Sequence, residues 1–472
     1  MIMIPYGKKE LRGGSYMKRG FIRLVALSMM FVMTIVLAAC ASKTNTTVDT
    51  KGTTEVAKDK TEETDTPNVS DEDKEIIFWN IGTESPDKDI YAYAVDKFNE
   101  TTKSGYTITS VPTQNDTYKE KLVIAMSSGE CPDMYTSWSG GPMNEYIDAG
   151  FAQPIDELFN ASDLPDKIMD AAIAQASYND HIYAVPMSNV SISGIFYNTE
   201  IFKEYGLEVP TTISELEAVC DTLVANGITP FALANGSKWT GSMYFMSLAA
   251  RMGGLEPFTD AVAGTGSFED ASFIYAGEKI QEWVKKGYFP EGVNSLSEDD
   301  GQAKQLMYQE KAAMLCCGSW YTGTFATDSP EFYAKIDWFS FPAVDGSAAD
   351  ASIQIGTVGD QFISFNCEGD KLAAAFEGAS IYLSEDSIQF MSDNGKIPPV
   401  KNVSDYLKDP VSKKILEAAN SASSTQLWYD QYLKPSVAQV HLDTCQELFG
   451  LTMTPEEAAA QFQKAMKTSL AK

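Results

Sequence analysis

From residue 75 onwards, the apolar positions of the chain follow two alternating patterns. Short runs that are continuously apolar, or apolar at every second residue, predict β-strands at 75–82, 106–112, 133–138, 194–198 and 228–233. Apolar residues at a spacing of three to four predict amphipathic helices at 88–100, 117–129, 199–206, 211–227 and 454–467. Strands that alternate with helices over this length predict an α/β fold with parallel-rich sheets and helices on both faces.

Two of these helices carry signals for their N-termini. Thr212 and Glu215 have the spacing of a capping box, in which the two residues bond to each other's backbone N–H groups. Thr454 and Glu457 repeat this spacing, and Pro455 stands at the first helical position, where its missing N–H is tolerated. We therefore expect both helices to begin directly after these threonines.

Residues 1–39 have the pattern of an export signal. Three basic residues within 18–23 precede an almost wholly apolar stretch, 24–39, which is shorter than the ~20 residues of a membrane-spanning helix. Met17 is an alternative start of the chain. The stretch ends in Leu-Ala-Ala-Cys, which resembles the lipobox of bacterial lipoproteins, so we expect Cys40 to carry lipid after cleavage. The alternative is an ordinary signal peptide beside a chance cysteine.

Residues 40–74 are expected to be the lipidated cysteine followed by a disordered tether. The stretch is dominated by Thr, Asp, Glu and Lys. Such a composition cannot bury enough apolar surface to offset the entropy lost on ordering. The folded part therefore begins near residue 75, and the protein is expected on the outer face of a cell membrane.

Length and charge narrow the class of protein further. The roughly 400 residues after the tether exceed what one hydrophobic core serves, so two lobes are expected. The chain carries a net charge of −29, and residues 1–39 hold six Lys or Arg and one Glu, so the exported part carries −34. This strongly acidic balance disfavours nucleic acid as a partner, because such binding needs basic patches.

The six cysteines beyond Cys40 are scattered and are expected mostly as small buried residues rather than disulfides. No Cys-x-x-Cys pair is present, and His181 and His441 are the only histidines, so a metal site is not expected. The family resemblance described below likewise implies no cofactor.

Six segments in a fixed order carry a resemblance to a known family. They are MSSGECPDMYTSW (126–138), HIYAVPMSNVSISGIFYNTEIFKEYGLEVPTTISELEAVCDTL (181–223), YQEKAAMLCCGSW (308–320), QFISFN (361–366), KIPPVKNV (396–403) and LTMTPEEAAAQFQKAM (451–466). Together they resemble the family 1 extracellular solute-binding proteins, the maltose-binding-like receptors of ABC sugar importers.

The resemblance implies a two-lobed, type II periplasmic-binding-protein-like fold with a hinge between the lobes. One lobe is expected at 75–190 with 350–400, and the other at 191–340 with 405–472. It also implies a monomer that captures a carbohydrate, by expectation an oligosaccharide, in the cleft and delivers it to the transmembrane subunits of an ABC permease. No covalent chemistry is expected.

A sugar ring has apolar C–H faces and a rim of hydroxyls, so its binder needs flat aromatic side chains together with carboxylates and amides. Trp283 and Trp338 lie in apolar helical and strand patterns and are expected in the core. Four others lie at strand ends or in turns, where open α/β sheets bind ligands: Trp138, Trp239, Trp320 and Trp428. In the family, the tryptophan of the GSW block, here Trp320, commonly stacks on sugar. The alternative for each is a half-buried packing position.

The expected polar contacts to the ligand are Glu84, Asn80, Asp116, Asp360 and Asp430. For Asp116, capping of the helix at 117 is an equal alternative. Lys238 is the only cation expected near the cleft, which disfavours an acidic solute.

Two other function classes stay open. A carbohydrate-active enzyme would need two carboxylates at a defined separation, and acidic residues are too numerous here to single out a pair. Ser-His-Asp chemistry would need His181, expected at the surface, or His441, and no nucleophile elbow or phosphate-binding loop is present. The other class is a sugar-sensing surface lipoprotein.

Overall fold

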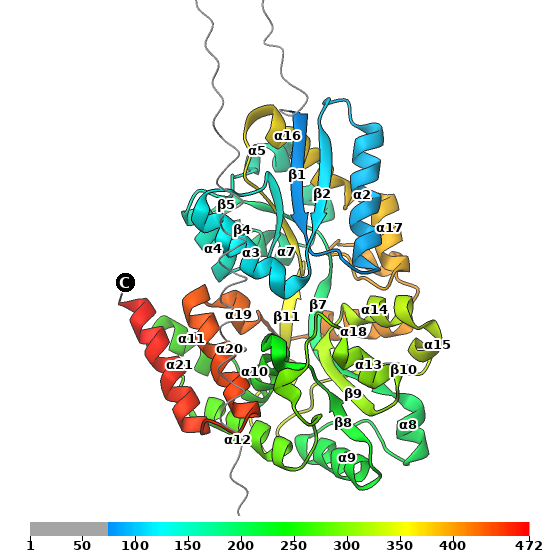
Figure 1. Cartoon of the computed structure of the whole chain (residues 1–472), viewed down its shortest axis with the longest axis vertical. Helices are drawn as coiled ribbons and strands as arrows, with labels where there is room; N and C mark the ends of the chain where they lie inside the picture. The colour runs from blue at the N-terminus through cyan, green and yellow to red at the C-terminus, as the bar shows by residue number, and fades with distance from the viewer. Residues whose placement is uncertain (1–73, 472) are drawn as a thin grey trace, which may run out of the picture. The chain divides into compact units, whose positions relative to one another are not determined.

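The computed structural model describes residues 74–471, and its strands form two main sheets (Figure 1). The first sheet has the order β2-β1-β3-β12-β6. β1 pairs in parallel with β2 and β3, whereas β12 runs antiparallel to both β3 and β6. The strands are β1 (Glu75–Asn80), β2 (Thr107–Pro112), β3 (Met134–Ser137), β6 (Ala184–Pro186) and β12 (Phe362–Phe365).

Helices cover this sheet, and together they form what we call the first lobe. α2 and α16 pack on the sheet and on each other, α17 packs on α2, and α3 packs on β3 through Tyr118 and Leu122. The helices are α2 (Asp87–Thr101), α3 (Asn115–Ser128), α4 (Gly141–Asp148), α5 (Asp156–Ala161), α6 (Leu164–Lys167), α7 (Asp170–Gln175), α16 (Gly369–Ile381) and α17 (Glu385–Asp393), with a small hairpin of β4 (Ser177–Tyr178) and β5 (His181–Ile182).

The second sheet is built around β7, whose nine residues are all buried. Its order is β13-β11-β7-β9-β8, and β10 also pairs with β7. The strands are β7 (Val190–Asn198), β8 (Thr229–Ala232), β9 (Ala312–Gly318), β10 (Ile336–Ser340), β11 (Gln354–Val358) and β13 (Thr425–Gln426).

The second lobe consists of this sheet and the remaining helices, of which α10, α12, α20 and α21 form a packed group (Figure 1). The helices are α8 (Thr199–Glu204), α9 (Ile213–Ala225), α10 (Trp239–Gly253), α11 (Glu256–Ala263), α12 (Ala271–Lys285), α13 (Gln302–Tyr308), α14 (Tyr321–Asp328), α15 (Pro330–Tyr333), α18 (Pro410–Ser421), α19 (Tyr429–Tyr432), α20 (Pro435–Phe449) and α21 (Pro455–Leu470), with short 3-10 turns η2 (Asn235–Ser237) and η3 (Val293–Ser295). A third 3-10 turn, η4 (Val403–Asp405), lies between α17 and α18.

The expected α/β class and two-lobed organisation are confirmed, but the sheets are mixed rather than parallel-rich. The reason is that β7, β11 and β12 adjoin the links between the sheets. β7 and β12 pair antiparallel with all their neighbours, and β11 pairs antiparallel with β7 but in parallel with β13. β11 belongs to the second sheet, although it falls in the 350–400 segment expected in the first lobe. The lobe borders given above otherwise stay a prediction.

Local predictions were accurate where the apolar pattern was regular. Both capping boxes form, at Thr212 with Glu215 and at Thr454 with Glu457. Trp283 and Trp338 are buried in the core. Among residues 74–471 all six cysteines are free, and all but Cys131 are buried.

Three segments link the lobes and are joined at one residue, through its backbone carbonyl and its side chain. They are residues 187–189 between β6 and β7, 359–361 between β11 and β12, and 394–409 between α17 and α18. Asn189 lies on the first of these, and its bonds tie it to the other two. The Asn189 carbonyl accepts from the N–H groups of Gly359 and Asp360, both at 2.9 Å, its side-chain Oδ1 accepts from Ile397 N at 2.6 Å, and its Nδ2 donates to Ser319 Oγ at 3.1 Å.

No helix among residues 74–471 has the length and apolar character needed to cross a membrane. The expected signal at 1–39, the lipidation site at Cys40 and the tether up to residue 73 lie outside the described residues.

Candidate ligand-binding cavity

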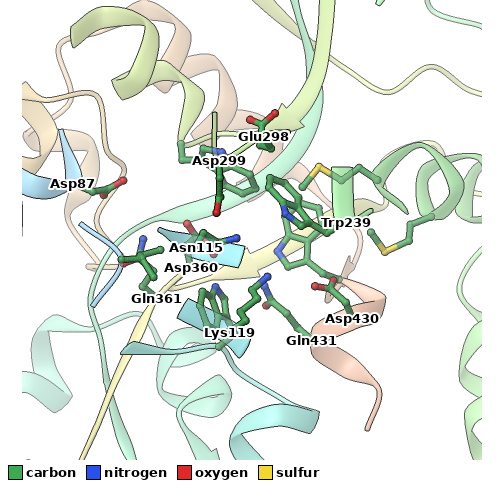
Figure 2. A pocket seen from close by; sticks show the side chains of 16 residues that line it. Asp87, Asn115, Lys119, Trp239, Glu298, Asp299, Asp360, Gln361, Asp430 and Gln431 are labelled. Atoms are coloured by element: carbon green, nitrogen blue, oxygen red, sulfur yellow. The ribbon is translucent and has the colours of Figure 1, made fainter. Parts of the chain in front are cut away.

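A cavity of about 200 Å³ lies between the two lobes, and the four tryptophans singled out from the sequence all line it (Figure 2). Trp138 follows β3 in the first lobe, whereas Trp239, Trp320 and Trp428 belong to the second. The other lining residues are Ile81, Asp87, Asn115, Lys119, Met243, Met246, Glu298, Asp299, Asp360, Gln361, Asp430 and Gln431.

In the second lobe, Trp320 contacts both of the other two tryptophans. Ring centroids of Trp239 and Trp320 are 6.0 Å apart, and those of Trp320 and Trp428 are 6.2 Å apart, with steeply inclined planes. Trp320 and Trp239 are half-buried, and Trp428 is buried. The indoles therefore form an aromatic wall with parts of its faces open to the cavity, and such a wall suits an apolar ligand face.

Gly318 makes room for this wall. A Cβ atom on Gly318 would lie 2.0 Å from Cζ3 of Trp320. Because β9 ends at this glycine, the Trp320 ring can fold back over the strand end towards the cavity.

Lys119 is the basic residue of the lining, and it lies between aromatic rings of both lobes. Its Nζ is 4.9 Å from the Trp138 centroid and 6.0 Å from the Trp239 centroid. Within residues 74–471, no carboxylate oxygen lies within the 4.0 Å of an ion pair with this ammonium. The Lys119 ammonium lies over these two ring faces, within the distance at which cation–π contacts form.

Carboxylates are the commonest polar groups of the lining, and burial disfavours their charged forms. Burial raises the pKa of Asp360 to about 7, with the Lys396 ammonium acting against the rise. Burial also raises the pKa of Glu298 to about 7, although Glu298 accepts a hydrogen bond from Tyr321. The pKa values of Asp299 and Asp430 are raised by the same cause.

Several bonds cross the cavity mouth between the lobes. Trp239 Nε1 donates to Asp116 Oδ1 at 3.1 Å. Asp116 N, in the first turn of α3, donates to Asp299 Oδ2 at 2.9 Å, and Gln114 Nε2 donates to the Asp299 carbonyl at 3.1 Å. Gln114, the N-cap residue of α3, makes no capping bond of its own, so α3 receives its cap from the opposite lobe.

Asp116 is not the N-cap residue of its helix, which was the alternative considered above. α3 begins at Asn115, which places Asp116 inside its first turn, with the side chain bonded to Trp239 and Asn115. Asp116 itself does not line the cavity.

Two other expected residues also lie outside the lining. Glu84 is exposed and pairs with Lys304 of the second lobe at 2.9 Å. Asn80 is fully buried, and its side chain donates to Ser110 Oγ and accepts from Gly82 N, so its polar atoms are engaged within the first lobe. The expectation that Lys238 is the cation near the cleft is wrong, because Lys238 pairs with Asp443 at 2.6 Å and Lys119 lines the cavity.

Sequence reasoning missed several lining residues for different reasons. Lys119 could have been found, because it lies near the start of the helix that follows the second predicted strand, and strand ends of one sheet meet at one edge. Glu298 and Asp299 lie in an aperiodic loop, and nothing in their neighbours signals a binding role. Met243 and Met246 belong to the buried stripe of α10 and look like core positions.

The two histidines lie away from this cavity. His181 is exposed and contacts Asp156. His441 is fully buried, and its Nε2 shares a hydrogen bond of 2.7 Å with Ser242, which is buried as well. Burial lowers the pKa of His441 to about 3, so this Ser–His pair sits neutral inside the core.

Comparisons with known proteins agree with this architecture. The family model described as bacterial extracellular solute-binding protein matches residues 82–387. An uncharacterized ABC transporter extracellular-binding protein of Pyrococcus horikoshii is 27% identical over 75% of this chain and 78% of its own length. The multiple sugar-binding protein of Streptococcus mutans is 26% identical over 72% of this chain and 79% of its own length.

Solved structures share the fold. One from work on xylan utilization by Caldanaerobius polysaccharolyticus superposes with a TM-score of 0.75 and 29% identity, covering 83% of this chain and 99% of the other. A chitin oligosaccharide binding protein superposes with a TM-score of 0.77 and 24% identity, covering 84% and 99%.

Proposed function

Because the chain belongs to the bacterial extracellular solute-binding proteins, we propose that it captures a carbohydrate between its lobes for uptake by an ABC importer. The observation that carries this proposal is the gathering of Trp138, Trp239, Trp320 and Trp428 on one cavity with carboxylates and amides among them. Indole faces match the apolar faces of a sugar ring, and the carboxylates and amides match its hydroxyl rim.

Hydroxyl groups of a bound sugar would find hydrogen-bond acceptors in the cavity lining. Gln431 is 9% exposed, and its Oε1 is buried without a hydrogen-bond partner among the described residues. An unsatisfied buried acceptor costs about 1–3 kcal/mol, which a ligand hydroxyl can recover by donating to it. Relatives named for multiple sugars and for xylose and arabinose favour the same ligand class.

The ligand would favour the closed arrangement through contacts with both lobes at once. Trp138 lies on one side and the three other tryptophans on the other, so only closure brings a sugar against both. In this proposal the protein acts as a monomer, holds Cys40 as a lipid anchor on the outer face of the membrane, and docks on permease subunits without performing catalysis.

A thermal-shift and calorimetry screen tests the proposal. The full-length protein, kept in a non-glycosidic detergent, is titrated with xylo-, malto- and chito-oligosaccharides of two to five units. A ligand at 100 times its Kd is expected to stabilise the protein by ~2.7 kcal/mol. Failure of every saccharide to bind would refute the proposed function.

Two controls sharpen the result. Trp320→Phe keeps an aromatic face and is expected to retain much of the binding, whereas Trp320→Ala removes the central indole and is expected to lose most of it. Chromatography of each saccharide after long incubation distinguishes binding from hydrolysis, because shortened products would favour the carbohydrate-active enzyme instead.

A further inference from the structure

The charges that line the cavity are strongly unbalanced. One lining residue is basic, Lys119, and the acidic ones are Asp87, Glu298, Asp299, Asp360 and Asp430 (Figure 2). They come from separate parts of the chain: the start of α2, the loop before α13, the 359–361 link and α19. The imbalance is therefore a property of the assembled cavity and not of one acidic run.

Three of the five carboxylates already have partners. Asp87 pairs with the buried Lys396 at 2.7 Å. Asp299 accepts from Asp116 N, and Glu298 accepts from the Tyr321 hydroxyl. These three groups have contacts within the protein that account for part of their hydrogen-bonding capacity.

Asp360 and Asp430 differ from them. Neither carboxylate forms a side-chain hydrogen bond or an ion pair with another residue of the described chain. Asp360 is 8% exposed, and Asp430 is half-buried two residues after Trp428 of the aromatic wall. The Lys119 ammonium is close enough to lower both pKa values, but burial outweighs it, and both pKa values stay raised.

A carboxylate without a partner in a closed site favours a positively charged or hydrogen-bond-donating neighbour. The aromatic faces beside it have the same preference, since the ring quadrupole attracts cations, and the ring contacts of Lys119 show that this cavity accepts an ammonium group. A ligand carboxylate would instead add a like charge to the acidic lining.

On the premise of the proposed function, we propose that the preferred ligand is a saccharide with a protonated amino group, held by Asp360 and Asp430 beside the indoles. Acetylation of that amine removes both its charge and its extra donors, and a uronic acid in its place reverses the charge. The order of affinity is therefore amino sugar, then neutral sugar, then acidic sugar.

Matched ligands test this order on the full-length protein at pH 7 and low ionic strength, because the pKa of Asp360 is about 7 and a lower pH would leave this carboxyl mostly protonated. Glucosamine oligomers, N-acetylglucosamine oligomers and glucuronate-containing oligomers of equal length are titrated by calorimetry. A charge-assisted bond contributes about 1.5–3 kcal/mol, so the glucosamine oligomer is expected to bind at least about tenfold more tightly than its acetylated counterpart. This preference is expected to shrink as salt rises.

Variants of the two carboxylates test whether these side chains cause the preference for the amino sugar. Asp360→Asn and Asp430→Asn keep the shape of the side chain and remove its charge. Each is expected to reduce the ratio between the affinities for the glucosamine oligomer and the acetylated oligomer, whatever it does to the affinity for neutral sugar. Asp386→Asn, on an exposed residue that pairs with Lys97, changes the net charge equally and is expected to leave the preference intact.

The outcomes separate the two proposals. Equal or tighter binding of the acetylated oligomer, or a preference that survives both cavity variants, overturns the amino-sugar inference and leaves carbohydrate capture standing. A protein that binds none of these ligands nor any neutral saccharide fails both proposals.

Discussion

Asp299 is the residue whose removal tests most directly how the two lobes are held together. It lies in the second-lobe loop before α13, and its Oδ2 accepts from the backbone N–H of Asp116 in the first turn of α3. Since Gln114 provides no cap of its own, Asp299→Ala leaves the N-terminus of α3 without a side-chain acceptor. The same turn presents Asn115 and Lys119 to the cavity.

The expected loss of ligand affinity follows from the free energy that a helix cap contributes. Replacing an Asp or Asn cap by Ala typically costs ~1 kcal/mol. This bond joins the lobes, so its loss destabilises only the closed arrangement, and the affinity for ligand should fall by the same free energy, about fivefold. Asp299→Asn retains a good capping acceptor and loses only the favourable contact between a carboxylate and the helix dipole.

The affinity of each variant is measured by calorimetry with a saccharide that binds in the screen proposed above. Asp299→Ala is expected to weaken binding about fivefold, Asp299→Asn clearly less, and the exposed neighbour Asp300→Ala not at all. The melting temperature without ligand should change by no more than a few degrees for all three. Wild-type affinity in the Ala variant would refute the capping argument, and an equal loss in Asn and Ala would assign the effect to charge instead.

Three further predictions concern other parts of the molecule. Gly318→Ala places a methyl group against the Trp320 ring, so we expect altered tryptophan fluorescence and at least ~tenfold weaker binding in a folded protein, and unchanged binding would contradict the packing. Asn189→Ala removes bonds to Ile397 and Ser319 and should lower the free energy of unfolding in urea by ~2–3 kcal/mol, whereas a loss below ~0.5 kcal/mol would rule out its tying role. His441 stays neutral in the native state down to about pH 3 while the unfolded chain takes up its proton near pH 6.5, so its contribution to stability is lost as pH falls through that window. In urea titrations from pH 7 to pH 4, His441→Gln should flatten this loss, and an unaltered slope would assign it to other groups.

The sequence predicted those features that short-range patterns encode. The helix expected at 211–227 is α9, Ile213–Ala225, because its apolar stripe and capping box are both local. The strand expected at 75–82 is β1, Glu75–Asn80. The antiparallel insertion of β12 beside β3 was not predictable, since pairing between residues more than 220 positions apart leaves no periodicity in either strand.

For the cavity too, some residues could be predicted from the sequence and others could not. The four tryptophans could be found because each one stands in a turn or at a strand end, unlike Trp283 within its helix. Asn80 was misplaced relative to the cavity because its side chain bonds to Ser110, a partner on another strand. The acidic excess of the lining depends on which carboxylates are brought together and buried, and this emerges only from tertiary packing.

The position of β12 determines when the first sheet can be completed during synthesis. This strand lies between β3 and β6, so the first sheet is completed by a segment translated long after the four strands around it. Until residue 365 has been synthesised, the nascent protein holds a gap in the middle of that sheet, with unpaired backbone on either side. The strand edges of β3 and β6 that face each other can therefore be joined only late in synthesis, after most of the second lobe has been translated.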